Sequence, residues 1–124
     1  ETARLKLADM AQFIYRRQRE SRNYDVHARA TQFLEVMGDV AVSGELLKQA
    51  VIAHAALAKR LESAGVNTGD AEALRAHLSD SAESAYYHNK IVSARFFIHQ
   101  VLPRVGAVCE AMLDEENYLR DALL

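Results

Sequence analysis

The sequence has few of the residues that cross-link or break a chain. Its 124 residues include one cysteine, one proline and five glycines. Because a disulfide needs two cysteines, no intramolecular disulfide can form, and a secreted disulfide scaffold is excluded. A reduced, cytoplasmic setting fits this cysteine usage best. The shortage of proline and glycine favours long uninterrupted elements.

An excess of charge of one sign is also missing. The 15 Lys and Arg residues face 17 Asp and Glu residues, so the formal net charge is -2. No basic field of the kind that holds nucleic acid or an anionic membrane therefore covers the whole molecule. No apolar run reaches the roughly 18 residues of a membrane span, and no basic-then-apolar leader opens the chain. We expect protein partners or self-association, with no nucleic acid and no membrane span.

Length and composition fit one globular domain. Half of the residues are hydrophobic and 26% are charged, which is ordinary for a chain that buries a single core. The first residue is Glu1 rather than Met, and an amphipathic pattern begins almost at once at Leu5. We therefore expect residues 1–124 to be a single helical domain that belongs to a larger chain.

Apolar residues at steps of three and four predict two helices in the first half. The first runs from Glu1 to about Arg22, and the second from Tyr24 to Ala64 with Asn23 as its cap. The second helix has the clearest seam, with a bend or break possible near Gly38 or Gly44. The predicted seam consists of Val26, Ala30, Phe33, Met37, Val40, Gly44, Leu47, Val51, His54, Ala58 and Leu61.

The second half starts with the only strong loop signal, Gly65 to Asp70, with Gly65 as the left-handed helix end and Thr68 or Asp70 as the next cap. A short helix is predicted over Ala71 to Leu78. Asp80 and Glu83 resemble a capping box that begins a last long helix at about 81 to 113. Pro103 should kink that helix, and a short final segment should follow over 115–124.

In the third predicted helix, apolar residues again recur at alternating steps of four and three. Its seam consists of Ile91, Arg95, Ile98, Leu102, Val105, Cys109 and Met112. With the two helices before it, this pattern predicts an all-α fold: an antiparallel helical bundle of three long helices plus short helices.

The five histidines do not predict a metal site. His27, His54, His77, His88 and His99 include no pair four residues apart, and the nearest pairs are eleven apart. On one helix that separation is about 16 Å, too far for two ligands of one ion. We interpret His54 as a core histidine bonded to a neighbouring helix. Cys109 is interpreted as a buried, inert thiol.

Two arginine features remain open to more than one interpretation. Arg16, Arg17, Arg19 and Arg22 could contact phosphate or nucleic acid, although cations at a helix C-terminus also offset its dipole. Arg95 occupies a seam position where an apolar side chain is expected. A buried guanidinium there would need a partner such as Asp39 or Glu45, or a carboxylate outside this segment.

Two stretches of the chain stand out: Tyr86 to Pro103, with an Ala-Arg-Phe-Phe step and a Leu-Pro pair, and Ala30 to Val40, followed by Leu46-Leu47 and an Ala-rich helix. The former resembles the closing segment of acyl-CoA dehydrogenases that carry an extra C-terminal domain, and the latter resembles the earlier half of the same extension. The residues that match the family pattern are Lys90, Arg95, Phe96, Phe97, Leu102 and Pro103. The segment from Val66 to Ser79 is longer than that pattern suggests.

The resemblance implies a function for the larger protein. The family includes broad-range long-chain and 3-methylmercaptopropionyl-CoA dehydrogenases, in which a carboxylate removes the α-proton and FAD takes hydride from the β-carbon. Since the base and the flavin contacts lie in upstream domains, the resemblance carries no catalytic, cofactor-binding or metal residue onto this chain. It implies an accessory and oligomerisation domain, with the six matching residues in packing or interface roles. The implied partners are the catalytic domains of the same chain and further copies in a homo-oligomer.

Two other interpretations stay open. One is a free-standing helical interaction or regulatory module that dimerises through the face with Phe96 and Phe97. The other is a nucleic-acid binder that uses the arginines from Arg16 to Arg22, whose affinity would fall steeply with salt.

Overall fold

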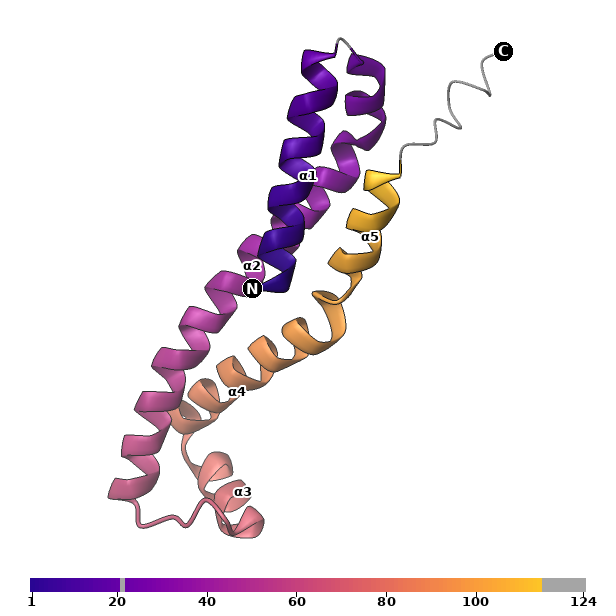
Figure 1. Cartoon of the computed structure of the whole chain (residues 1–124). Helices are drawn as coiled ribbons and strands as arrows, with labels where there is room; N and C mark the ends of the chain where they lie inside the picture. Colours follow the sequence, from indigo (N-terminus) through magenta and orange to yellow (C-terminus); the bar gives the residue numbers. More distant parts are fainter. Residues whose placement is uncertain (21, 115–124) are drawn as a thin grey trace. The chain divides into compact units, whose positions relative to one another are not determined.

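The computed structural model describes residues 1–20 and 22–114, and all the elements among them are helical (Figure 1). The chain divides into two compact units, Glu1–Ala41 with Val101–Leu124 as unit 1 and Val42–Gln100 as unit 2. The predicted all-α class is therefore confirmed. The final segment predicted over 115–124 lies outside the described residues.

Unit 1 is built from α1 (Thr2–Arg19), the first part of α2 (Asn23–Ser63) and α5 (Arg104–Leu113). α1 ends three residues earlier than predicted. The fully buried core of the unit consists of Met10, Val36, Val105, Cys109 and Met112. Burying one such apolar side chain stabilises a fold by about 1.5 to 3 kcal/mol, so these five residues are the main source of cohesion among the three helices.

Two ion pairs tie the helices of unit 1 around this core. Lys6 of α1 donates to Glu110 of α5 over 2.5 Å. Arg104 of α5 donates to both carboxylate oxygens of Asp39 on α2, over 2.6 and 2.8 Å. Because Asp39 is only 8% exposed and Arg104 is largely solvent-accessible, the pair anchors the start of α5 to a buried charge.

Unit 2 contains the rest of α2, then α3 (Ala71–Asp80) and α4 (Ala82–Phe96). Gly65 has φ +66°, the left-handed conformation predicted for the helix end. The Asp70 carboxylate accepts from the backbone N–H groups of Glu72 and Ala73, so Asp70 is the cap of α3.

The cap of α4 differs from the prediction. Ser81, not Asp80, is the N-cap, and its hydroxyl accepts from the backbone N–H of Ser84. The predicted Asp80–Glu83 capping box is therefore wrong, because α3 continues through Asp80 and the single non-helical residue between the two helices is Ser81. Glu83 instead accepts a hydrogen bond from the Tyr87 hydroxyl.

The third predicted long helix is divided into three parts. α4 ends at Phe96, a π-helical turn η1 follows over Phe97–Val101, and α5 begins after Pro103. The disruption predicted at Pro103 is confirmed, because the helix is interrupted at Leu102 and Pro103. Proline has no N–H to bond the carbonyl four residues back, and the wider π turn just before it accommodates the interruption.

The predicted seam of α2 lies mostly on the outside of the chain. Its exposed members are Ala30, Met37, Gly44, Leu47, Val51, His54 and Ala58. The interpretation of His54 as a core residue is therefore wrong. Val36 in unit 1 and Ala53, Leu57 and Leu61 in unit 2 are the buried apolar residues of this helix. α2 is helical at every residue from Asn23 to Ser63, without the break considered near Gly38 or Gly44.

By length and composition alone, two stretches could cross a membrane: α2, and the helical stretch from Ala82 to Leu113, each with a mean hydropathy of 1.2 over its most apolar window. Bundle helices meet the same criterion. The charged residues Asp39, Glu45 and Lys48 stand in the middle of α2, and charges at the centre of a span are costly in lipid. One or two helices of this kind are weak evidence for a membrane span.

Candidate interaction surface

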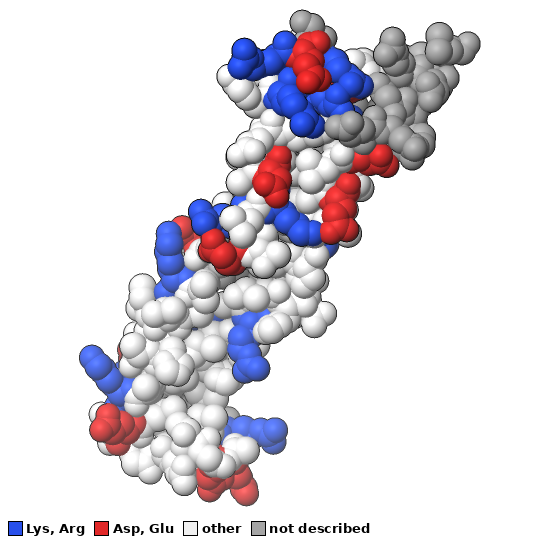
Figure 2. All heavy atoms as spheres, in the orientation of Figure 1, with Lys and Arg blue, Asp and Glu red and all other residues white. Residues whose placement is uncertain are grey.

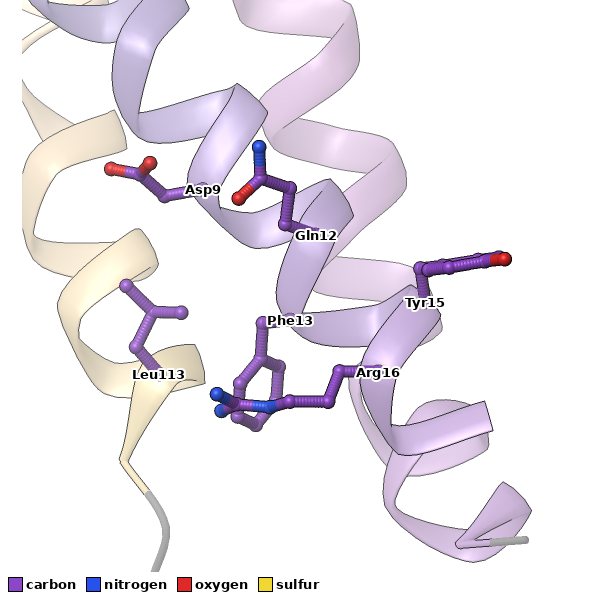
Figure 3. A pocket seen from close by; sticks show the side chains of 6 residues that line it. All are labelled: Asp9, Gln12, Phe13, Tyr15, Arg16 and Leu113. Carbon is purple, nitrogen blue, oxygen red and sulfur yellow. The ribbon is translucent and has the colours of Figure 1, made fainter. Parts of the chain in front are cut away.

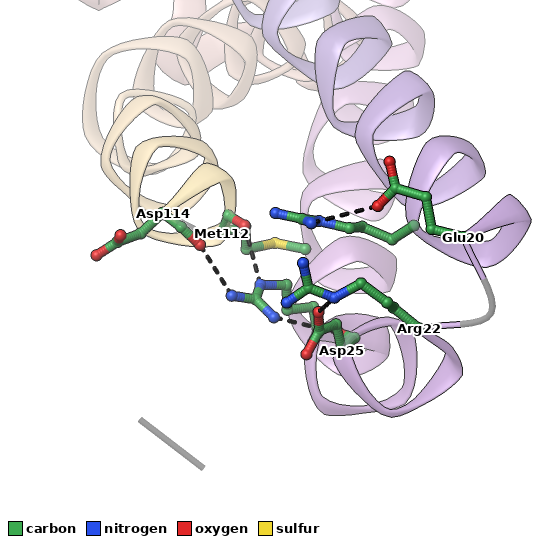
Figure 4. A network of polar contacts seen from close by, with 7 residues as sticks. Glu20, Arg22, Asp25, Met112 and Asp114 are labelled. Atoms are coloured by element: carbon green, nitrogen blue, oxygen red, sulfur yellow. Dashed lines mark hydrogen bonds and ion pairs between the residues drawn. The ribbon is translucent and has the colours of Figure 1, made fainter. Parts of the chain in front are cut away.

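Arg16, Arg17, Arg19 and Arg22 lie where α1 ends and α2 begins, and Figure 2 shows a group of blue Lys and Arg atoms at that end of the two helices. Arg17 pairs with Glu20 at 3.4 Å, and Arg22 pairs with Asp25 at 2.8 Å (Figure 4). Asp25 is itself only 5% exposed. These pairs hold the turn between the two helices.

Arg29 links α2 to the end of α5. Its guanidinium donates to the backbone carbonyls of Met112 and Asp114, each over 2.9 Å (Figure 4). The last carbonyls of a helix have no partner within the helix, and a cation at that end also offsets the helix dipole. Arg29 therefore acts as a side-chain cap for α5.

The ring of Phe13 is the apolar centre of this arginine group. The guanidinium carbons of Arg16, Arg17 and Arg29 lie 5.6, 5.0 and 5.8 Å from its centroid. Cation–π contacts of this kind contribute about 0.5 to 1 kcal/mol at exposed sites. Phe13 was not predicted as a core residue from the sequence, although it stands three residues after Met10 on the inward face of α1.

A hollow of about 480 Å³ lies beside this ring, and Figure 3 shows Arg16 reaching over Phe13 at its edge. Its lining residues are Asp9, Gln12, Phe13, Tyr15, Arg16 and Leu113. The hollow opens to solvent, and Asp9 contributes a carboxylate to its wall. The carboxylate of Asp9 in the wall, the local pairs of Arg17 with Glu20 and of Arg22 with Asp25, and the packing of Arg16 on Phe13 favour the structural interpretation of these arginines over a phosphate site.

A buried polar cluster joins the helices of unit 2. The Ser84 hydroxyl, fully buried, lies 3.0 Å from His77 Nε2 and accepts from Arg60 Nε over 3.3 Å. Arg60 also pairs with Glu83 at 2.7 Å. A serine beside a histidine could suggest a nucleophile, but Ser84 has no exposed surface through which a substrate could reach it. The cluster instead satisfies the polar groups where α2, α3 and α4 meet.

A small apolar groove lies between α2 and α4 in unit 2. It has a volume of about 200 Å³, and its lining residues are Gln49, Ile52, Ala53, Tyr86, Tyr87 and Lys90. Lys90 donates to Gln49 over 3.0 Å and stands 5.3 Å from the centre of the Tyr86 ring. The side chain of Lys90 therefore lies along the groove and joins the two helices.

The other residues predicted as structural or interface positions are spread along α4, η1 and the start of α5. Phe96 is 62% exposed at the end of α4, while Phe97 is half-buried in η1. Leu102 packs against the core of unit 1, and Pro103 is the exposed cap of α5.

Arg95 is exposed, and the expectation that it occupies a buried seam position is wrong. Its neighbour Ala94 is 2% exposed and takes the inward position. The π turn holds one extra residue, so the seam that runs cleanly from Ile98 to Met112 does not extend back to Arg95. Of the partners suggested for it, Asp39 binds Arg104, and Glu45 binds Lys48 over 2.7 Å.

Cys109 is fully buried, as expected for an inert thiol. Burial raises the pKa of its thiol, with smaller electrostatic contributions from Lys6, Glu110 and Asp9. The reactive thiolate is therefore disfavoured at neutral pH. Within residues 1–20 and 22–114, no three His, Cys, Asp or Glu side chains group as they would around a metal ion.

Large apolar side chains are exposed on both units. In unit 2 they are Val42, Leu47, Val51, Ile52, Tyr86, Val92 and Phe96. In unit 1 they are Leu5, Tyr15, Tyr24, Leu34 and Met37. Large exposed apolar side chains of this kind occur at contacts with other proteins when they form a patch, and they are ordinary when they are scattered singly. The described residues thus form an all-helical module with exposed apolar side chains and open hollows.

The family of this module is shown by sequence comparison. The chain belongs to the family described as acetyl-CoA dehydrogenase C-terminal like, whose model matches residues 1–122. The resemblance to the C-terminal helical domain of acyl-CoA dehydrogenases is thereby confirmed. No curated protein sequence and no solved structure matched the chain in the corresponding searches.

The resemblance implies a flavin in the whole protein. Three of the hollows among the described residues measure about 480, 410 and 200 Å³, and all three open to solvent. Cofactor sites bury most of their ligand in a pocket that is largely closed, so none of these three hollows fits a flavin. We assign no catalytic step to the residues that line them.

Proposed function

We propose that this chain is the C-terminal accessory and oligomerisation domain of an FAD-dependent acyl-CoA dehydrogenase. The parent enzyme would carry out α,β-dehydrogenation of an acyl-CoA in fatty-acid or related acyl-CoA catabolism, in the cytoplasm. The catalytic base and the flavin would be held by upstream domains of the same chain. This segment would contribute packing surface rather than chemistry.

The observation that carries the proposal is the family match, which spans residues 1–122 of the 124. The surface supports it in physical terms. Seven large apolar side chains of unit 2 are between 45% and 69% exposed. Exposed apolar area on this scale favours association, because its removal from water contributes about 25 cal/mol per Å².

The test compares two proteins: the one expressed from its native start codon, and residues 1–124 alone. Each is assayed for acceptor-dye reduction with a ladder of acyl-CoAs in the presence of FAD. Activity in the long form only, together with a bound yellow flavin, is the expected result. A long form without flavin and without activity would refute the proposal and favour a free-standing interaction module that uses Phe96 and Phe97.

A further inference from the structure

Unit 2 buries little of its own apolar surface. Its buried hydrophobic residues are Ala53, Leu57, Leu61 and Ala94, two of which are alanines. A helical layer with one apolar face against a neighbour and another in water is incomplete as a packed unit. The second face of this unit is therefore a candidate surface for a further helix.

The part of α2 in unit 2 carries two parallel stripes at the spacing of helix contacts. The inner stripe is half-buried or buried, and it consists of Ser43, Leu46, Ala50, Ala53 and Leu57. One residue further along, the same steps of three and four give a stripe that is entirely exposed, which we call the outer seam. The outer seam consists of Gly44, Leu47, Val51, His54 and Ala58.

The angle between the two stripes indicates a missing neighbour. Successive residues of an α-helix are about 100° apart, so the stripes face directions about 100° apart. A helix inside a bundle contacts two neighbours in this manner. The α4 helix lies along the inner stripe, where Lys90 binds Gln49.

The spacing of the outer seam also indicates what covers it. Apolar or small residues at alternating steps of three and four are the pattern that packs against another α-helix, side chain into hole. Ala58 is small, so a neighbouring helix can approach closely beside it, while Val51 is 64% exposed and supplies a larger side chain.

Charges beside the seam are arranged to complement a second copy. Lys48 and Glu62, both exposed, follow Leu47 and Leu61 on the same flank, seven residues to either side of Ala55. A twofold axis at Ala55 would set Lys48 of one copy against Glu62 of the other, and the reverse. This requires antiparallel helices, since in a parallel pair Lys48 would face Ser43.

We propose that the second half of the outer seam, which consists of Val51, His54 and Ala58, is the surface through which two copies of this chain pair, with their α2 helices antiparallel and Ala55 at the twofold axis. The inference rests on the proposed function, because it names the surface for the self-association proposed there. Lys48 already binds Glu45, but that pair is exposed on both sides and contributes little, so it can be exchanged.

The experiment uses the protein from its native start codon with Ala55→Cys, treated with a short bis-maleimide. We expect a band at twice the chain mass that is absent from the parent protein, which controls for all other cysteines. Lys48→Glu or Glu62→Lys alone should weaken self-association about tenfold and reduce the band. The double exchange Lys48→Glu with Glu62→Lys should restore it, and Arg75→Glu on the exposed side of α3 should leave it unchanged.

Three results would overturn the inference, and sedimentation velocity of the parent protein separates them. A monomeric parent would refute both the self-association and the seam. If the parent protein is oligomeric but neither its cross-linking nor its mass changes with the charge exchanges, the proposed seam alone is refuted. If Val51→Glu lowers the Tm while the Ala55→Cys variant yields no cross-link, another part of the same chain covers the seam. Circular dichroism of each variant confirms that it is folded.

Discussion

At the residue scale, the two partners of the ion pair between Arg104 and Asp39 differ in burial, and this difference predicts which substitution destabilises the fold. Asp39 is nearly buried, whereas its partner Arg104 is more than half exposed. Removing the arginine would leave a carboxylate in a poorly hydrated position, which costs more than leaving a guanidinium in water. The hydrogen bond from Arg104 to Asp39, together with their attraction, also raises the pKa of the arginine.

Two matched arginine substitutions test this arrangement. We expect Arg104→Met to lower the urea midpoint of unfolding clearly, because Asp39 loses its partner. Arg95→Met should change the free energy of unfolding by less than about 0.5 kcal/mol, as is usual at an exposed position. Equal losses for the two variants would contradict the placement of both side chains.

The pair between Lys6 and Glu110 predicts a pH dependence. The hydrogen bond from Lys6, followed by its charge, lowers the pKa of Glu110 below the ordinary value of 4.5. A lowered pKa in the folded state adds stability above the ordinary pKa, and this stability is lost as the pH falls through the lowered pKa.

Glu110→Gln should therefore reduce stability at pH 7 and make the loss of stability below about pH 4.5 less steep. Thermal unfolding followed at several pH values between about 3 and 7 measures both effects. Parallel curves for the two proteins, offset by a constant amount, would show that the pair does not titrate as described.

The reactivity of Cys109 can be checked directly. Because the thiol is fully buried and its pKa is raised, a colorimetric thiol reagent should react with it only when the protein unfolds. The rate of reaction should follow the unfolding transition as urea is added. Rapid reaction in the native state would contradict the described packing of α5.

At the scale of the elements, the caps of α3 and α4 give a test of the helix boundaries. Ser81 caps α4 with its side chain, and Asp80 is the last residue of α3. We expect Ser81→Ala to destabilise the chain by about 1 kcal/mol, the usual cost of a lost N-cap, and Asp80→Ala to cost less. The reverse order would restore the capping box predicted from the sequence.

Positions and types of helix could be predicted from the sequence, because apolar residues at steps of three and four show where a helix forms. The inward face of α2 could not be predicted. Its apolar residues lie on several sides, so the seam through Leu47 and Val51 and the stripe through Ala53 and Leu57 look alike in the sequence. Which of the two faces is buried depends on the neighbouring helices, and the spacing of apolar residues does not identify those neighbours.

Among the site residues, too, some features could be predicted from the sequence and others could not. The disruption at Pro103 follows from the missing N–H of proline and was predicted. The exposure of Arg95 was not, because the π turn over Phe97–Val101 shifts the seam by one position and has no sequence signal of its own. Asp39 was considered as an arginine partner, but for Arg95 rather than Arg104.

At the scale of the whole molecule, the chain is an all-helical member of the acetyl-CoA dehydrogenase C-terminal like family, with large apolar side chains exposed on both units. We propose that other protein covers this apolar surface and that upstream domains hold the flavin. The domain should therefore affect assembly and stability of the parent enzyme more than the chemical step.

The most direct test of that claim is the mass of the parent protein with and without residues 1–124, measured by sedimentation equilibrium and accompanied by the flavin spectrum. We predict that the protein without this domain retains bound flavin but forms a smaller assembly than the intact protein. An unchanged assembly, with flavin bound in both forms, would contradict an oligomerisation role for the domain.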